Sequence, residues 1–420
     1  MHEFHYKKGE LFCESLKISD IANVVETPFY LYSYKTITDH YNKIRKAFGS
    51  LRPLICYSMK ANSNLSIVKI LVNEGAGLDI VSGGELYKAL KVGVDPKKIV
   101  YASVGKTAKE IHQAITAGIL MFNVESHSEL HTINYVARKL RKKVNVAIRI
   151  NPDVDAATHH YITTAKKENK FGIDLDVARD IFARRSSFGS VRIVGLHIHI
   201  GSQISQGKPF ITAIKKLRDF IAELASLGIR LEYFNIGGGL GIIYKNEKPM
   251  TAEVFARAVV PLLKKTGLKI ILEPGRFIVG NAGILVTKIQ YIKSSQRKRF
   301  VIVDAAMNDL MRPALYDAYH DIIPLSDGNR KGSMSKADIV GPVCESGDFF
   351  AKNRLFPELY EGECLAVMGA GAYGYSMASN YNARVRPAEI LVKKNTFYVI
   401  RKREQYADLI RGEEFPRILR

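Results

Sequence analysis

The amino-acid sequence predicts an α/β fold in which a (β/α)8 TIM barrel is joined to a second, mostly β domain. Between residues 53 and 276, eight short apolar runs alternate with segments of helical periodicity. After Gly280 helical periodicity becomes scarce, and segments rich in Val and Ile follow one another. Eight strand–helix units in a span of this length are typical of a barrel. An open, doubly wound sheet is the alternative, and eight repeats make it the less favoured one.

The eight expected barrel strands are short, apolar and separated by helical patterns. In chain order they are residues 54–58, 78–81, 99–102, 120–124, 144–150, 193–200, 231–236 and 270–272. Two of the intervening helices begin with the spacing of a capping box, Thr107 with Glu110 and Ser126 with Glu129. In this motif the two side chains satisfy backbone N–H groups of the first turn, so we expect helices to begin there.

The two domains are expected to meet near residues 30 and 280. Residues 31–280 would form the barrel, and residues 1–30 together with 281–420 would form a β domain of sandwich-like or barrel-like form. The expected strands beyond the barrel are residues 284–292, 300–304, 338–343, 364–368 and 389–392. Their content of β-branched residues favours extended structure over helix.

The composition indicates a soluble, cytoplasmic protein without a metal site. The 420 residues are 47% hydrophobic, which is ample for one large core and a second unit. The net charge of +21 raises the question of nucleic acid, but the basic runs are short and lack an interleaved aromatic platform. The first residues lack the apolar core of a secretory signal, and no apolar run reaches membrane-spanning length. Four cysteines without metal-type spacing do not indicate a disulfide framework.

Lys60 follows the first expected strand, where the strand gives way to a helix. In a barrel the working groups project from the C-terminal ends of the strands, and alternate strand residues share a face. By this rule Lys60 is topmost on its strand and Asp79 lies near the top of the second. His197 and His199 share one face of the sixth strand. An amine at such a mouth can form a Schiff base with an aldehyde cofactor.

Glycines and an arginine follow the last two expected strands. The seventh strand ends in a triple glycine that includes Gly239, and the eighth is followed by Glu273, Gly275 and Arg276. Loops after these two strands are the usual phosphate site of barrels, because glycine lets backbone N–H groups approach an anion. Arginine can bind phosphate or carboxylate with two hydrogen bonds. Ser202, just past the sixth strand, adds a hydroxyl donor.

An amine, a phosphate cradle, a stacking histidine and an acid at one barrel mouth describe a site for pyridoxal 5'-phosphate. Glu273 is the deciding residue, because a carboxylate beside the pyridine nitrogen keeps that nitrogen protonated and makes the ring a strong electron sink. An arginine there would leave the nitrogen neutral, as racemisation needs. The strong sink suits loss of CO2 from an amino acid.

On these motifs the sequence resembles, nearly end to end, the barrel-fold, alanine-racemase-like pyridoxal phosphate decarboxylases. Within them it is similar to the branch that converts meso-2,6-diaminopimelate to L-lysine. The matching segments are residues 57–62, 197–203, 237–239, 273–276, 312–316, 344–346 and 371–373. The segment 312–316 and Glu345 after Cys344 are what point to the diaminopimelate branch.

The resemblance implies a role for each matched residue. Lys60 would hold the cofactor and His199 would stack on its ring, with Asp79 and Glu273 as further cofactor-binding residues. The phosphate and its surroundings would be held by Ser202, Gly239, Gly275, Arg276 and Tyr373. The remote end of the substrate would be bound by Arg276, Arg312, Tyr316, Tyr373 and Glu345. Cys344 would reprotonate the carbanion. In this family Cys344 and Glu345 come from the partner subunit, which implies a homodimer with shared active sites.

Three alternatives stay open. The first is a decarboxylase of the same fold that acts on ornithine, arginine or a carboxylated polyamine. The second is a pyridoxal phosphate-binding protein without catalysis, although that barrel lineage lacks a second domain. The third is a basic nucleic-acid binder, which would show salt-dependent association. The long connection of residues 153–172 is expected to act as a lid over the site.

Overall fold

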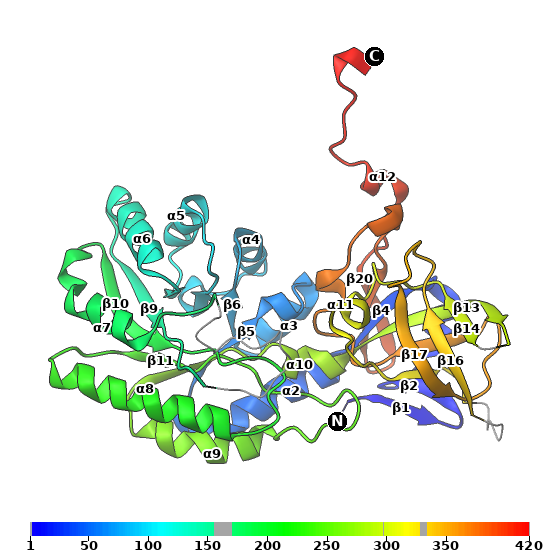
Figure 1. The fold of residues 1–420 in the computed structure, drawn as a ribbon, viewed down its shortest axis with the longest axis horizontal. Helices are drawn as coiled ribbons and strands as arrows, with labels where there is room; N and C mark the ends of the chain where they lie inside the picture. The colour runs from blue at the N-terminus through cyan, green and yellow to red at the C-terminus, as the bar shows by residue number, and fades with distance from the viewer. Residues whose placement is uncertain (1, 155–169, 297, 328–333, 420) are drawn as a thin grey trace. The chain divides into compact units, whose positions relative to one another are not determined.

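The computed structural model describes residues 2–154, 170–296, 298–327 and 334–419 (Figure 1). The chain divides into two compact units, one of residues 37–278 and one of residues 1–36 together with 279–420. Most of the connection that we expect to act as a lid lies outside the described residues. None of the described helices combines the length and the hydropathy that a membrane crossing requires.

The unit of residues 37–278, which we call the barrel unit, is a closed barrel of eight parallel strands, as predicted. Its strands are β5 (Leu54–Ser58), β6 (Gly77–Ile80), β7 (Ile99–Tyr101), β8 (Met121–Val124), β9 (Val144–Arg149), β10 (Val191–His197), β11 (Tyr233–Asn235) and β12 (Lys269–Leu272). The barrel closes where β12 pairs with β5, with Ile271 opposite Leu54. Buried side chains such as Cys56, Val100 and Ala147 fill its interior.

Helices alternate with the barrel strands and lie outside them (Figure 1). They are α2 (Tyr34–Ala47), α3 (Leu65–Asn73), α4 (Gly83–Lys91), α5 (Ala108–Ala117), α6 (His127–Lys139), α7 (Leu175–Ala183), α8 (Lys208–Ser226), α9 (Ala252–Lys264) and α10 (Arg276–Val279). The capping box that was predicted at Thr107 is complete at the start of α5. At α6 only half of the predicted box forms, because the Glu129 carboxylate accepts from the backbone N–H of Glu125 instead of Ser126.

The sixth strand ends earlier than predicted, and this changes the position of one histidine. β10 ends at His197 rather than at residue 200. Its neighbour β11 ends at Asn235 and the chain then turns at Gly237, which has a φ of +68°, so β10 has no partner to extend along. The prediction that His197 and His199 share one face of a strand is therefore wrong. His199 lies in the loop that follows.

The second unit is mostly β, as predicted. It contains a three-stranded sheet and a nine-stranded sheet. The strands are β1 (Phe4–Lys7), β2 (Glu10–Cys13), β3 (Leu16–Lys17), β4 (Phe29–Ser33), β13 (Gly283–Ser294), β14 (Arg299–Val303), β15 (Ile322–Pro324), β16 (Ser335–Val340), β17 (Phe349–Phe356), β18 (Cys364–Val367), β19 (Ala388–Lys393) and β20 (Thr396–Arg401). Its helices are α1 (Ile18–Val24), α11 (Arg312–Tyr316) and α12 (Tyr406–Leu409).

The early strand β4 ties the start of the chain into this sheet. It pairs antiparallel with β13 and parallel with β19, and all five of its residues are buried. Phe29 and Leu31 pack in one core with Ile284 and Ile390. Apolar burial on this scale stabilises the unit by about 1.5–3 kcal/mol for each large side chain. The N-terminal residues therefore belong to the β unit.

Candidate active site

Lys60 lies at the carboxyl end of the barrel, beside Asp79. It belongs to a short 3-10 turn (Met59–Ala61) that follows β5, and its Nζ lies 3.0 Å from Oδ2 of Asp79 on β6. Ser58 donates a second hydrogen bond to the same oxygen at 2.8 Å. Burial and the nearby Glu273 charge raise the pKa of Asp79, and Lys60 and Ser58 offset part of that rise. A third of the Lys60 side chain (33%) is exposed, so its amine is accessible.

Glu273 directly follows β12 and is surrounded by hydrogen-bond donors. Its Oε1 accepts from the amides of Asn123 at 3.1 Å and Asn235 at 2.5 Å. Its Oε2 lies 3.1 Å from Nε2 of His197. Burial alone would raise the pKa of Glu273, but its interaction with His197, the charge of Lys60 and the Asn235 amide hold the pKa below its ordinary value. The residue is therefore a buried, ionised carboxylate.

The two asparagines are site residues that sequence reasoning missed. Asn123 is on β8 and Asn235 is at the end of β11, and neither has exposed surface. A buried side-chain amide is costly unless it is hydrogen-bonded, so a polar residue in an otherwise apolar strand indicates a partner. The sequence therefore indicated that each asparagine has a hydrogen-bond partner, but it did not indicate that the partner is Glu273.

His199 lies in the loop after β10 and is oriented by the triple-glycine loop. The backbone N–H of Gly238 lies 3.3 Å from Nδ1 of His199, which accepts the bond, so the ring proton is on Nε2. Burial lowers the pKa of His199 well below its ordinary value, and the positive charges of Lys60 and Arg149 lower it further. The ring is neutral near pH 7. A neutral imidazole has a flat face that suits stacking on an aromatic ring.

Close backbone contacts explain the glycines of the predicted phosphate loops. A Cβ at Gly238 would lie 2.1 Å from the carbonyl oxygen of Glu273, and one at Gly239 would lie 2.5 Å from that of Gly201. Gly239 also has a φ of +112°, which side chains rarely adopt. At Gly275 a Cβ would lie 3.0 Å from that of Ser58. Side chains are therefore excluded at the points where the loops pack against the strand ends.

Arg276 is buried and oriented by two hydroxyl groups. Its Nε and Nη2 donate to Oγ of Ser202 at 3.3 and 3.1 Å, and its Nη1 donates to the hydroxyl of Tyr244 at 2.6 Å. The predicted Arg276 and Ser202 thus come together, and Tyr244 is an addition. A guanidinium fixed in this way presents a defined geometry to phosphate or carboxylate.

The remaining predicted residues belong to the β unit. Arg312 begins α11, is buried, and donates from Nε to Nε2 of His320 at 3.2 Å. Tyr316 ends the same helix and is half-buried. Tyr373 has a φ of +57°, a left-handed conformation that is uncommon for a residue with a large side chain. Such strained backbone occurs preferentially at functional sites.

Cys344 lies in an exposed loop between β16 and β17. Its backbone N–H donates to Oδ1 of Asn382 at 2.8 Å. Asp348, which is buried, accepts from the N–H of Val343 at 2.7 Å and so fixes the turn. Sequence reasoning missed both Asn382 and Asp348. They hold the backbone of the loop while the thiol stays exposed.

Glu345 lies in the same loop and is also exposed. Its Oε2 accepts a hydrogen bond from the hydroxyl of Tyr381 at 2.8 Å. This bond, followed by the charge of Glu345, raises the pKa of Tyr381 above its ordinary value. Tyr381 is therefore a neutral hydrogen-bond donor near pH 7. It contacts Oε2 of Glu345, and among the described residues no hydrogen bond to the other carboxylate oxygen, Oε1, is found.

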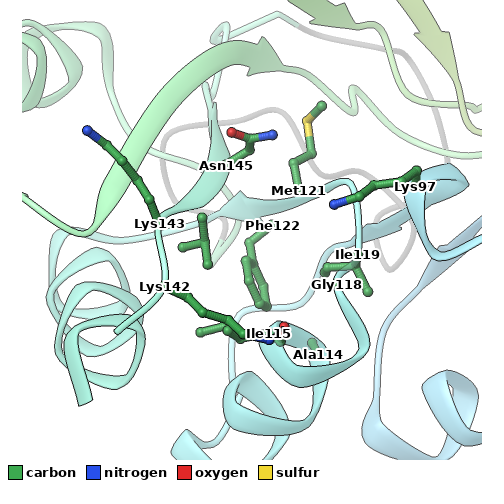
Figure 2. Close-up of a pocket in the computed structure, with 11 residues that line it drawn as sticks. Lys97, Ala114, Ile115, Gly118, Ile119, Met121, Phe122, Lys142, Lys143 and Asn145 are labelled. Carbon is green, nitrogen blue, oxygen red and sulfur yellow. Dashed lines mark hydrogen bonds between the residues drawn. The ribbon is translucent and has the colours of Figure 1, made fainter. Parts of the chain in front are cut away.

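A cavity of about 240 Å³ lies at the other end of the barrel (Figure 2). Met121 and Val144, the first residues of β8 and β9, line it together with Phe122 and several lysines, among them Lys97 and Lys142. None of the predicted site residues lines it. Because the predicted residues of the barrel unit lie at or just after the carboxyl ends of the strands, this cavity is separate from the candidate active site.

The chain is similar in sequence and in structure to known pyridoxal-dependent decarboxylases. Residues 34–280 match the family described as "Pyridoxal-dependent decarboxylase, pyridoxal binding domain". The chain is 50% identical to a diaminopimelate decarboxylase of Aquifex aeolicus, over 96% of this chain and 95% of that protein. A diaminopimelate decarboxylase from M. jannaschii, solved in complex with L-lysine, has a TM-score of 0.94 and 40% identity, with all of both chains covered. That from Helicobacter pylori, also with L-lysine, has a TM-score of 0.91 and 44% identity, covering 94% of this chain and 99% of that one.

Proposed function

This chain belongs to the diaminopimelate decarboxylases, a family of pyridoxal-dependent enzymes, and we propose that its own residues decarboxylate meso-diaminopimelate to L-lysine. The observation that carries the proposal is the pairing of an accessible amine with a buried, ionised carboxylate at one end of the barrel. Lys60 supplies the amine and Glu273 the carboxylate. A protein that only stored the cofactor would have no need of a carboxylate that keeps the ring nitrogen protonated.

The residues at the barrel mouth fit pyridoxal phosphate. Lys60 has an accessible amine that can bond to an aldehyde. The glycine loops exclude side chains, and Arg276 with Ser202 supplies the donors that a phosphate requires. The neutral ring of His199 can lie against the cofactor ring. When bound, pyridoxal phosphate supplies an electron sink for the electron pair left by loss of CO2.

The substrate explains why charged residues accompany this site. Meso-diaminopimelate has an ammonium and a carboxylate at its far end, and burying either without a partner is costly. We assign the carboxylate to Arg312 and Arg276, helped by the hydroxyls of Tyr316 and Tyr373. Glu345 takes the ammonium. Ornithine lacks the remote carboxylate and would leave Arg312 without its ionic partner, so it would be discriminated against.

Cys344 is the group that we assign to proton delivery. Its thiol transfers a proton to the carbon from which CO2 has left, and the thiolate is reprotonated from water. The exposed loop and the fixed backbone of Cys344 suit a side chain that must reach a reacting atom. Positioned proton donors contribute roughly 10²- to 10⁴-fold to such steps.

We further propose that the enzyme is a cytoplasmic homodimer, with Cys344 and Glu345 supplied to each site by the partner subunit. Four free cysteines, one of them exposed, suit a reducing compartment. Mixing the Lys60→Ala and Cys344→Ala variants tests the shared site. In a two-fold dimer, exchange of subunits should restore about a quarter of wild-type activity. Two inactive variants that stay inactive after exchange would contradict a shared site.

The function itself is tested with purified protein, added pyridoxal phosphate and a substrate panel. CO2 release is measured from meso-diaminopimelate, ornithine, arginine and a carboxylated polyamine. Preference for meso-diaminopimelate by a factor of 100 or more is expected, since an unpaired buried charge costs several kcal/mol (about 1.4 kcal/mol per tenfold). Faster release from one of the others would identify that amine as the substrate instead.

A further inference from the structure

We infer that His197 is a positioning residue that holds Glu273 in place and leaves one of its oxygens, Oε2, open toward the cofactor ring. This inference rests on the proposed function, because it requires a pyridine nitrogen to face Glu273. His197 ends β10, and only 1% of it is exposed. Its contact with the carboxylate joins the end of β10 to the residue after β12, with β11 between the two strands.

The distribution of donors identifies the open oxygen. A carboxylate oxygen has two acceptor positions. Both positions of Oε1 are taken, by the amides of Asn123 and Asn235. In the described part of the chain, Oε2 accepts only from His197. One acceptor position of Oε2 therefore remains, and we assign it to the N–H of the cofactor ring.

The environment of His197 identifies which of its ring nitrogens acts on Glu273. Its Nδ1 is buried and has no hydrogen-bond partner among the described residues. A proton on Nδ1 would be a buried, unsatisfied donor, which is costly. Nε2 is therefore the ring nitrogen that donates, and its partner is Oε2 of Glu273. This hydrogen bond orients the carboxylate that keeps the cofactor nitrogen protonated.

The test compares two substitutions of similar size that differ in the donor. His197→Gln retains a side-chain N–H near the position of Nε2, whereas His197→Met has none. Each protein is loaded with pyridoxal phosphate that carries ¹⁵N in the ring. The ¹⁵N chemical shift reports directly whether the ring nitrogen is protonated. Turnover and thermal melting are measured on the same samples.

We expect the cofactor's ring nitrogen to be protonated in the wild type and in His197→Gln. In His197→Met its ¹⁵N chemical shift should move toward that of an unprotonated ring nitrogen. Loss of one hydrogen bond to a charged group should lower kcat of His197→Met by roughly 10- to 100-fold. His197→Gln should stay within a few-fold of the wild type. His197→Asn, whose amide lies nearer to the Nδ1 position, provides a second variant without the donor should His197→Met not fold.

Two outcomes would overturn the inference. One is a donor-free variant with an unchanged ¹⁵N shift and unchanged turnover. The other is an equal loss in His197→Gln and His197→Met with an unchanged ¹⁵N shift, which would show that the imidazole only fills space. Failure of the proposed function is distinct, because it would appear in the wild type as absence of cofactor binding or of CO2 release.

Discussion

The Nζ of Lys60 lies 3.0 Å from Oδ2 of Asp79, a carboxylate that has no exposed surface. The contact places the amine at the carboxyl end of β6, on the side of the barrel where we locate the cofactor. A buried carboxylate with one ionic partner becomes costly when that partner leaves. Asp79 also accepts from Ser58, so it keeps one hydrogen bond when the amine is engaged elsewhere.

Removing the amine should abolish covalent attachment of the cofactor. Lys60→Ala is expected to lose the visible absorbance that bound pyridoxal phosphate gives when it is joined to a lysine, and to lose turnover. Absorption spectra after gel filtration measure this directly. Lys91→Ala, at the exposed end of α4, is the matched control and should keep the wild-type spectrum. An unchanged spectrum in Lys60→Ala would place the attachment elsewhere.

Neutralising Glu273 should impair turnover more than cofactor binding. In Glu273→Gln the new NH2 group must face a donor, either His197 or the two asparagine amides, and the negative charge is lost. Loss of charge-assisted hydrogen bonding should lower kcat by roughly 100-fold. Steady-state kinetics and the absorbance of the bound cofactor give the two readings. Glu253→Gln, exposed on α9, is the control, and full turnover in Glu273→Gln would refute the assigned role.

The barrel strands were predictable because strands buried on both faces appear as short apolar runs. β5 has the predicted bounds, residues 54–58. Strand ends were less predictable, because they depend on where the neighbouring strand stops. β10 illustrates this, since it ends at His197 once β11 turns away at Gly237. In the β unit, residues 1–30 were expected to join the β domain, but the bounds and partners of β4 were not predicted, because its pairing with β13 joins segments that are far apart in the sequence.

The site was predictable where a residue's chemistry is evident from its position at a strand end. Lys60, Asp79 and Glu273 are of this kind, and the structure brings them to one end of the barrel. The amides that surround Glu273 could not be predicted, since Asn235 reaches it from the adjacent strand β11 and Asn123 from β8, four strands away around the barrel. Contacts of this type depend on the closure of the barrel and the stagger of its strands, which no local pattern specifies.

A buried acid in the β unit should make stability depend on pH. Burial raises the pKa of Asp309 to about 7 from an ordinary value of 3.8. Between these pKa values Asp309 is protonated in the folded chain and ionised in the unfolded chain. The contribution of the neutral Asp309 to the free energy of unfolding is therefore complete below about pH 4 and is lost as the pH rises through 7. Asp309→Asn cannot ionise and should flatten this dependence. Thermal melting between pH 4 and 8 measures it, and parallel curves for the two proteins would contradict the prediction.

Replacing the proposed proton donor should slow turnover and spare cofactor binding. Cys344→Ala is expected to lower kcat by roughly 100-fold, because a positioned acid is lost. The absorbance of bound cofactor should be unchanged. Cys364→Ala, in β18 and partly buried, is the control that removes a thiol from the same unit. Loss of cofactor in Cys344→Ala would indicate that the residue is structural.

Arg312 should determine affinity for the remote carboxylate of the substrate. Arg312→Met removes a buried guanidinium and should lower kcat/KM for meso-diaminopimelate by roughly 100-fold, since a charge-assisted hydrogen bond contributes about 1.5–3 kcal/mol. L-lysine has no remote carboxylate, so its affinity should change only a few-fold. Inhibition constants for L-lysine, measured beside the kinetics, separate the two effects.

The location of Arg312 makes a control necessary, because its Nε donates to His320 and the substitution disturbs that contact. Arg354 also donates to His320, through the backbone carbonyl, and has no assigned role with the substrate. Arg354→Met should therefore disturb the same neighbourhood without a selective loss of meso-diaminopimelate. If Arg312→Met weakened meso-diaminopimelate and L-lysine equally, Arg312 would support the fold rather than bind the carboxylate. A selective loss would instead show that this guanidinium distinguishes a substrate with two carboxylates from an ordinary diamino acid.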